Sequence, residues 1–374
     1  MSQLLFYNDA RQIGGHEKLM IEAIISLSTK HSVAVIVSDY NTELCRILQK
    51  ISGVEVNMIH YASNSRQIIR NFFSLKTFFL LYNQIRRMSP ELIVSVQGTI
   101  DTSFLAILVG RFLKIKTISY LPFAFKLARV SKHPQIGWLK DRIQYLYYSA
   151  PNGYITLNEA VKRQIQERFS KKKVLIVHNG LKYDRYTSYS PKEMRQKYEL
   201  PEKLFLFGIV GRFEYWHKGL DFFLNFLDRY HSELPANIGF VFVGDGSDKE
   251  LLLQQVERYK NVYVIPWSQN ISEIYALINA LILPSRFEGV PLTILEALYL
   301  GCPVIASDID GVRDLLSSEH LFTFGCYDQL LNRLLGIWNK RIGASYLDRN
   351  LYSMTCFCRE FSKAIDFYCN DFKN

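Results

Sequence analysis

Short apolar segments alternate with amphipathic segments along this chain, and they do so in two consecutive series. The first series has expected strands at residues 4–7, 33–37, 92–96, 117–120, 153–156 and 174–177. The second begins at Leu204 and continues through 239–243, 262–265, 280–283 and 303–306. Strands that alternate with helices in this way form parallel, doubly wound sheets. The sequence therefore predicts an α/β protein built from two Rossmann-like domains.

Length and composition agree with this fold class. The 374 residues suit two domains of about 150–200 residues each. Residues 181–200 are polar and rich in Tyr, Ser and Lys, as a linker would be. We expect an N-terminal domain over 1–185 and a C-terminal domain over 186–349, and residues 350–374 to be helical.

The sequence also indicates the compartment. No apolar run approaches the roughly 20 residues that span a bilayer. The first eight residues have no basic segment or cleavage site, so we expect a strand there and not a signal peptide. The six cysteines are scattered and form no zinc-site pattern, which favours free thiols in a reducing cytoplasm.

Two carboxylates flank a predicted strand–loop–helix junction in the second series. Glu288 follows an apolar run that ends at Pro284, at the edge where open α/β sheets bind ligands. Pro291 suits the first position of a helix, and the free amides of Leu292 and Thr293 would form an anion site. Glu296 follows on the same helix. These residues suit a ligand that has both a diphosphate and hydroxyl-rich sugars.

This stretch resembles the E-x7-E motif of the retaining group 1 (family 4-like) glycosyltransferases. The family has the GT-B fold, in which two Rossmann-like domains face each other across a cleft. Five further motifs match the family in order and spacing; they lie at 14–17, 177–180, 208–219, 242–246 and 302–314. Together the matches cover most of the chain.

The resemblance implies a function and roles for particular residues. The chain is expected to transfer a hexose, with retention, from a nucleotide-diphosphate sugar bound by the C-terminal domain. Its acceptor, a glycan or lipid-linked glycan of surface polysaccharide biosynthesis, is expected on the N-terminal domain. The final helix is expected to pack back on that domain, and domain closure to bring its glycine loop to the diphosphate. Glu288, Arg212 and Lys218 are the expected catalytic residues. The other expected donor-binding residues are Gly14, Gly15, Gly211, Trp267, Gly289, Val290, Leu292, Thr293 and Glu296.

The chain departs from the family pattern at two positions, and two further features need an interpretation. Many members have a histidine after the strand that matches 117–120, whereas this chain has Tyr120, which we expect on the acceptor side. Pro266 replaces a frequent glycine next to Trp267. The Asp308–Asp310 pair resembles a metal-binding motif of the other glycosyltransferase fold, but the GT-B fold needs no metal, so no metal or cofactor is expected. His217 is expected to be a surface residue.

The charge distribution suggests an anionic partner, either lipid headgroups or a phosphate-bearing acceptor. The net charge is +10, and the basic excess lies in the first half of the chain. Segment 66–87 contains five cations among large apolar residues, which is typical of an interfacial helix or of a well-buried one. We expect peripheral contact with anionic lipid at the inner face of the cell membrane, and no nucleic-acid binding.

Two other functions remain open at this point. Sugar-nucleotide epimerases share the fold, but they need acid/base groups that the first domain does not clearly offer. A non-catalytic partner subunit is the other alternative, because the family histidine is missing. The sugar, the nucleotide, the acceptor, the linkage and the oligomeric state cannot be derived from the sequence.

Overall fold

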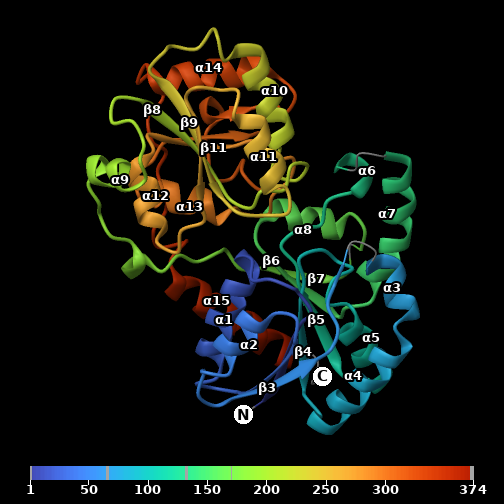
Figure 1. Cartoon of the computed structure of the whole chain (residues 1–374). Coiled ribbons are helices and arrows are strands. Elements are labelled where there is room, and N and C mark those ends of the chain that lie inside the picture. Colours follow the sequence, from blue (N-terminus) through green and yellow to red (C-terminus); the bar gives the residue numbers. More distant parts are fainter. Residues whose placement is uncertain (1, 65–66, 131–133, 170, 371–374) are drawn as a thin grey trace. The chain divides into compact units, whose positions relative to one another are not determined.

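The structure is a computed structural model, and it describes all residues except 1, 65–66, 131–133, 170 and 371–374. The chain divides into two compact units, described separately below. Unit 1 comprises Met1–Gly180 with Ser353–Asn374, and unit 2 comprises Leu181–Tyr352 (Figure 1). Residues 181–200, the expected linker segment, belong to unit 2. All six cysteines are described residues, and none of them forms a disulfide bond.

Unit 1 has a seven-stranded parallel sheet in the order β3-β2-β1-β4-β5-β6-β7. Its strands are β1 Gln3–Asn8, β2 Ser32–Ser38, β3 Val54–Ile59, β4 Leu92–Val96, β5 Lys116–Tyr120, β6 Gly153–Thr156 and β7 Lys173–Ile176. Its helices are α1 Gly15–Leu27, α2 Thr42–Leu48, α3 Gln67–Phe73, α4 Leu75–Met88, α5 Leu105–Leu113, α6 Leu127–Val130, α7 Pro134–Ser149, α8 Glu159–Gln166 and α15 Met354–Asn370.

Unit 2 has a six-stranded parallel sheet in the order β10-β9-β8-β11-β12-β13. Its strands are β8 Phe205–Val210, β9 Ile238–Gly244, β10 Val262–Pro266, β11 Ala280–Leu283, β12 Val304–Ser307 and β13 Leu321–Phe322. Its helices are α9 Pro191–Lys197, α10 Leu220–Tyr230, α11 Lys249–Val256, α12 Ile271–Leu277, α13 Leu292–Tyr299 and α14 Tyr327–Trp338, with short 3-10 turns η1 Tyr183–Arg185 and η2 Ser318–His320. The prediction of two doubly wound parallel sheets is confirmed.

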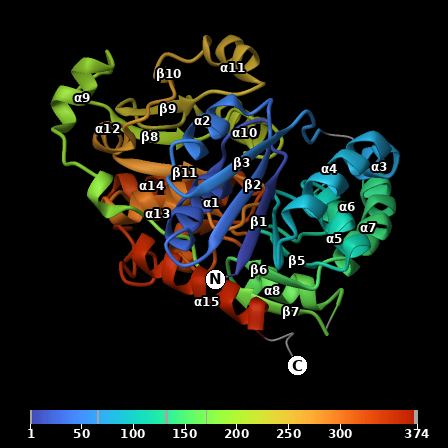
Figure 2. The ribbon, with the colours of Figure 1, turned by 90° about the horizontal axis from the view of Figure 1, so that it is seen from below.

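The last helix of the chain, α15, packs in unit 1. Phe361 lies 6.4 Å from Phe6 of β1, measured between ring centroids, and 5.4 Å from Tyr120 of β5. The Tyr368 hydroxyl bonds the backbone of Tyr154 on β6, accepting from its N–H and donating to its carbonyl. These contacts bury one face of α15 beside α1 (Figure 2).

A group of helices, α3 to α7, forms one flank of unit 1 (Figures 1 and 2). Segment 66–87, expected to be a single helix, is two helices that meet at Ser74, whose backbone leaves helical geometry. The Ser74 hydroxyl donates to the Arg70 carbonyl at 2.8 Å, which ties the junction to the last turn of α3. No described helix is long and apolar enough to cross a bilayer.

Candidate active site

The expected site residues of unit 2 cluster where the strand order reverses. Strands β8 and β11 are neighbours in the sheet, yet their crossovers run to opposite sides, and such switch points form crevices at the carboxyl ends of the strands. A shallow pocket lies there, lined in part by Gly211, Arg212, Lys218 and Ser285. The loop after β8 and the loop after β11 therefore face the same crevice.

Lys218 and Glu288 form a direct ion pair across this crevice. The Lys218 ammonium donates to Glu288 Oε1 at 2.7 Å, and the Ser285 hydroxyl donates to the same oxygen at 2.8 Å. The Glu288 side chain is 7% exposed and that of Lys218 is 20% exposed. From the sequence we expected Lys218 to contact a phosphate and Glu288 a sugar, whereas in the structure the two side chains contact each other.

The ionisation of Glu288 follows from this pairing. Burial alone raises the pKa of the carboxyl group, but the charges of Lys218 and His217 and the bonds from Lys218 and Ser285 outweigh it. The pKa of Glu288 is therefore lowered from its ordinary value, and the group is an anion at neutral pH. A buried anion in such a crevice can stabilise positive charge that develops on a reacting carbon beside it.

Close backbone packing holds the two loops together. Gly219 adopts a φ of +64°, and a side-chain carbon there would lie 1.9 Å from the Pro284 carbonyl oxygen. Only glycine fits this position. The Arg286 guanidinium bonds Trp216 O at 2.7 Å and pairs with Asp221, and it lies 3.6 Å from the centroid of a Trp216 ring. The crevice is thus formed by two fixed loops.

The start of α13 lies at the end of the second loop. Pro291 was expected at the first helical position, but it is the N-cap, with ψ of 121°, and the helix begins at Leu292. Gly289 and Val290 are buried, and a side-chain carbon on Gly311 would lie 1.8 Å from Gly289 O. The loop after β12 thus supports the Glu288–Gly289 backbone.

The remaining expected donor-binding residues of unit 2 differ in exposure. Arg212 is 55% exposed and pairs with Glu214 at 3.1 Å. Trp267 follows β10 and is 46% exposed. Glu296 accepts a long hydrogen bond, 3.5 Å, from the Tyr186 hydroxyl. Arg212 and Trp267 are accessible, and Glu296 lies against the segment that enters unit 2.

The Asp308–Asp310 pair has a cationic partner within the protein. Arg313 bonds Asp308 Oδ1 through Nε at 2.5 Å and Asp310 Oδ1 through Nη1 at 2.7 Å. Both carboxylates thus form one ion-pair group with a single guanidinium, a structural role that accounts for their spacing.

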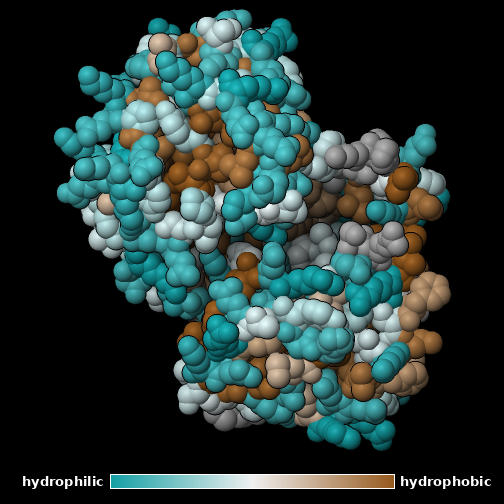
Figure 3. Space-filling view, viewed as in Figure 1, coloured by the Kyte–Doolittle hydropathy of each residue, from teal (hydrophilic) through white to brown (hydrophobic). Residues whose placement is uncertain are grey.

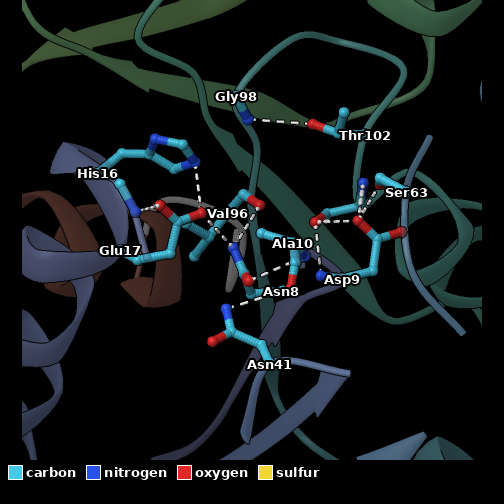
Figure 4. Close-up of polar contacts among 12 residues, drawn as sticks. Asn8, Asp9, Ala10, His16, Glu17, Asn41, Ser63, Val96, Gly98 and Thr102 are labelled. Carbon is cyan, nitrogen blue, oxygen red and sulfur yellow. Dashed lines mark hydrogen bonds and ion pairs between the residues drawn. The ribbon is translucent and has the colours of Figure 1, made fainter. Parts of the chain in front are cut away.

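In unit 1, Gly14 and Gly15 follow β1, which is next to β4 at the equivalent switch point, and Figure 4 shows the neighbouring side chains of His16 and Glu17. The helix starts at Gly15, earlier than expected, because Glu17 reaches back and accepts from the Gly14 N–H at 2.7 Å. Glu17 is 1% exposed and also accepts from the Asn8 amide at 3.1 Å and contacts His16 Nε2 at 2.6 Å. Its bonds from His16, Gly14 and Asn8 outweigh burial, so its pKa is lowered.

His16 is a residue that sequence reasoning did not single out. Because the ionised Glu17 can only accept, His16 Nε2 must carry a proton, which leaves Nδ1 of a neutral ring as an acceptor. A side-chain carbon on Gly98 would lie 3.5 Å from the His16 ring, and one on Gly14 would lie 3.8 Å from it. The two glycines therefore leave room beside the ring. Unit 1 thus contains an imidazole–carboxylate pair, whereas no acid/base group of this unit was clearly placed from the sequence.

Tyr120 does not fit its expected role. Its side chain is 0% exposed, lies edge-on against Phe361, and has a pKa raised above the ordinary value by burial. The expectation of an acceptor-side contact is wrong for this structure, because β5 directs the ring into the packing of α15.

Comparison with known proteins agrees with this arrangement. Residues 205–337 match the family model described as "Glycosyl transferases group 1". Over 98% of its length the chain superposes on all of Anabaena HepE, solved in complex with UDP and glucose, with a TM-score of 0.75 and 16% identity. The chain is a group 1 glycosyltransferase with the GT-B fold.

Two curated relatives of this glycosyltransferase act in glycan assembly. A Campylobacter jejuni enzyme that transfers N-acetylgalactosamine to a diphosphoundecaprenol-linked acceptor is 23% identical over 337 residues, covering 88% of this chain and 86% of the relative. The Salmonella typhimurium lipopolysaccharide 1,6-galactosyltransferase is 29% identical over 195 residues, covering 48% of this chain and 51% of the relative. The Salmonella match spans about half of each protein.

Proposed function

We propose that this glycosyltransferase is a retaining, metal-independent enzyme that transfers a hexose from a nucleotide-diphosphate sugar to a glycan or lipid-linked glycan of surface polysaccharide biosynthesis. The observation that carries the proposal is the buried Glu288 carboxylate paired with Lys218 beside the accessible Arg212. The relatives named above support the acceptor class. The donor is assigned to unit 2 and the acceptor to unit 1.

The proposed chemistry uses charges that the site already contains. Lys218 and Arg212 neutralise the departing diphosphate, Lys218 as a point charge and Arg212 as a planar fork. The N–H groups of Leu292 and Thr293 face an anion at the start of α13. The C1–O bond breaks with its electron pair going to the phosphate, and Glu288 stabilises the cationic character left on the sugar. The acceptor oxygen bonds C1, and the leaving phosphate takes the acceptor proton.

Incubation with a panel of nucleotide sugars tests this function. Slow hydrolysis of one donor supports transfer, and it should persist in the presence of a metal chelator. Interconversion of two sugars would instead support an epimerase, for which His16 and Glu17 offer acid/base groups. No reaction with any donor would favour a non-catalytic partner subunit. Loss of hydrolysis with chelator, restored by a divalent ion, would contradict metal independence.

The flank of unit 1 formed by α3 to α7 supports a peripheral membrane contact, at the inner face of the cell membrane. Large apolar side chains there are more than half exposed, among them Phe73, Phe79, Phe112, Trp138, Leu139 and Leu146. Figure 3 shows apolar side chains gathered along the edge over α7, α3 and α4. Exposed cations lie on the same helices: Lys76, Arg86, Arg87, Arg111, Lys114, Lys140 and Arg142. We call this surface the aromatic flank.

One cation of the expected interfacial segment, Arg70, does not serve this contact as anticipated. Arg70 donates to the Ala62 carbonyl at 2.5 Å and lies over the Tyr61 ring, so it is bound to its own unit. Arg66 lies outside the described residues. Helix α7 contributes further exposed residues from outside the expected interfacial segment; its apolar residues lack a clean helical periodicity, so this surface was not evident from the sequence.

Replacing Lys76, Arg87 and Lys140 by Glu together should reduce binding to anionic vesicles by about a hundredfold or more at low salt. Each surface cation near an anionic leaflet contributes about 1 kcal/mol, and the attraction is screened within a Debye length. Co-sedimentation with vesicles of anionic lipid measures the binding. Lys192→Glu and Lys249→Glu, which remove cations from unit 2, serve as the matched control and should leave binding nearly unchanged. Wild-type protein that does not co-sediment at low salt would exclude the membrane contact.

A further inference from the structure

His217 lies between the two loops that carry Lys218 and Glu288. Its ring stacks on Phe287, with centroids 4.2 Å apart and planes within 7°. The side chain is 18% exposed, so it is not the surface residue that the sequence suggested. Its backbone carbonyl also accepts from the Arg286 N–H at 3.0 Å. The residue thus contacts the second loop through its ring and through its backbone.

Both ring nitrogens of His217 face hydrogen-bond acceptors. Nδ1 lies 3.0 Å from Glu214 Oε2, and Nε2 lies 3.0 Å from the Phe287 carbonyl oxygen. A carbonyl oxygen only accepts, and an ionised carboxylate only accepts. The bond from His217, helped by the charges of Arg212 and Lys218, outweighs burial and lowers the pKa of Glu214 to about 2. Glu214 is therefore ionised at neutral pH, and each nitrogen of His217 faces an oxygen that can only accept.

The His217 ring, which is hydrogen-bonded through both of its nitrogens, determines how the neighbouring residues are placed. Phe287, which accepts from Nε2, directly precedes Glu288, and His217 directly precedes Lys218. Fixing the ring therefore fixes the backbone on both sides of the 2.7 Å contact between Lys218 and Glu288. We propose that His217, as an imidazolium, is a positioning residue that holds these two loops in the geometry that binds a nucleoside diphosphate. This inference rests on the proposed function.

Loss of one proton disrupts this arrangement. A neutral imidazole has a single N–H, so one nitrogen would turn a lone pair toward an oxygen. The charged groups around the ring are Glu214, Arg212, Lys218, Glu288 and Arg286, and Arg286 is itself paired with Asp221. A bound diphosphate adds negative charge near these groups and so favours the imidazolium. Binding and protonation are therefore linked, and each promotes the other.

Calorimetric titration with UDP, and with GDP and ADP in parallel, measures this link. For the wild-type protein, we expect the affinity for the nucleotide that binds to fall about tenfold between about pH 6 and about pH 9, as expected for the loss of one charge-assisted hydrogen bond. Titrations in buffers of different ionisation enthalpy should also show proton uptake on binding at the alkaline end.

Glu214→Gln is the decisive variant. The amide nitrogen of a Gln can donate to Nδ1, so a neutral His217 satisfies both contacts, and the pH dependence should flatten while alkaline binding is retained. The ligand's own ionisation is the same in both titrations, so it cancels from the comparison. This variant also removes the carboxylate that pairs with Arg212, which should raise the affinity for the nucleotide at every pH. That effect does not change the slope of affinity against pH.

His217→Phe keeps the stacking on Phe287 without either hydrogen bond. We expect weaker binding at every pH, with no proton uptake, and a fall in kcat for donor hydrolysis larger than any rise in KM. Thermal unfolding verifies that this variant is folded. Equal pH slopes in the wild type and in Glu214→Gln would overturn the positioning role. Failure of the wild type to bind any of the three nucleotides at any pH would instead contradict the proposed function.

Discussion

Glu288→Gln is expected to lower the rate of sugar transfer by roughly a hundredfold to a thousandfold, the usual effect of removing one group that stabilises transition-state charge. Gln keeps the size of the side chain but cannot carry the negative charge. The rate of donor hydrolysis measures the effect when the acceptor is unknown, and the rate of transfer measures it once an acceptor is found. Turnover at the wild-type rate would remove Glu288 from the mechanism.

The same variant has a second expected effect, on nucleotide binding. From the sequence, binding of the diphosphate should be unaffected, because Glu288 was expected to face only the sugar. The structure changes this expectation, since Glu288 holds the Lys218 ammonium at 2.7 Å. Glu288→Gln releases that cation toward the phosphates, so affinity for the nucleoside diphosphate should stay equal or increase. Glu296→Gln is the matched control: it removes the second carboxylate of the same motif, which accepts from the Tyr186 hydroxyl, while the Lys218–Glu288 pair stays intact, so it should not strengthen binding.

Much of the fold could be predicted because its signals are local. The apolar runs of β8, β9 and β11 are fully or largely buried, and parallel strands covered on both faces show this continuous pattern. Strand β3 was missed. Its residues are only partly buried at the sheet edge, and Glu55 and Asn57 interrupt the apolar run. The start of α1 was placed late because a helix that opens on two glycines has weak propensity, and the cap from Glu17 compensates.

The candidate site could be located from the sequence, but its internal contacts could not. The motif spacing placed Glu288, Lys218 and Arg212 at strand ends, and parallel strands bring such ends together. Which side chains pair depends on the packing of the two loops, where Gly219 brings the backbone against Pro284. His217 was misjudged for the same reason, since both of its acceptors depend on that packing. Tyr120 was misjudged because the helix that buries it begins more than 200 residues later.

Lys218→Met is expected to destabilise the protein by about 3–5 kcal/mol near neutral pH, the usual cost of removing one partner of a buried ion pair. The Met side chain retains the apolar stem but leaves the 7%-exposed Glu288 carboxylate without its cation. Nucleoside diphosphate binding should weaken by about tenfold or more as well, since a charge-assisted contact to phosphate is lost. Chemical denaturation and calorimetry measure the two effects separately.

The pH dependence of this variant has a definite sign. In the wild type the pKa of Glu288 is lowered, so its contribution to stability is present above the ordinary carboxyl pKa and is lost as the pH falls through the lowered value. Without Lys218 burial dominates and the pKa of Glu288 rises. The destabilisation of Lys218→Met relative to the wild type should therefore shrink on going from about pH 8 to about pH 5, as the carboxyl group takes up a proton.

Two further variants separate the effect of breaking the Lys218–Glu288 ion pair from the effect of losing a cation at the binding site. Lys218→Met combined with Glu288→Gln removes both charges, so it should recover most of the stability while nucleotide binding stays weak. Arg212→Ala removes a cation that is 55% exposed, and it should weaken binding with little effect on stability. If the double variant is as unstable as Lys218→Met alone, the cost does not arise from an unpaired Glu288, and the buried ion pair is not what holds the two loops in place.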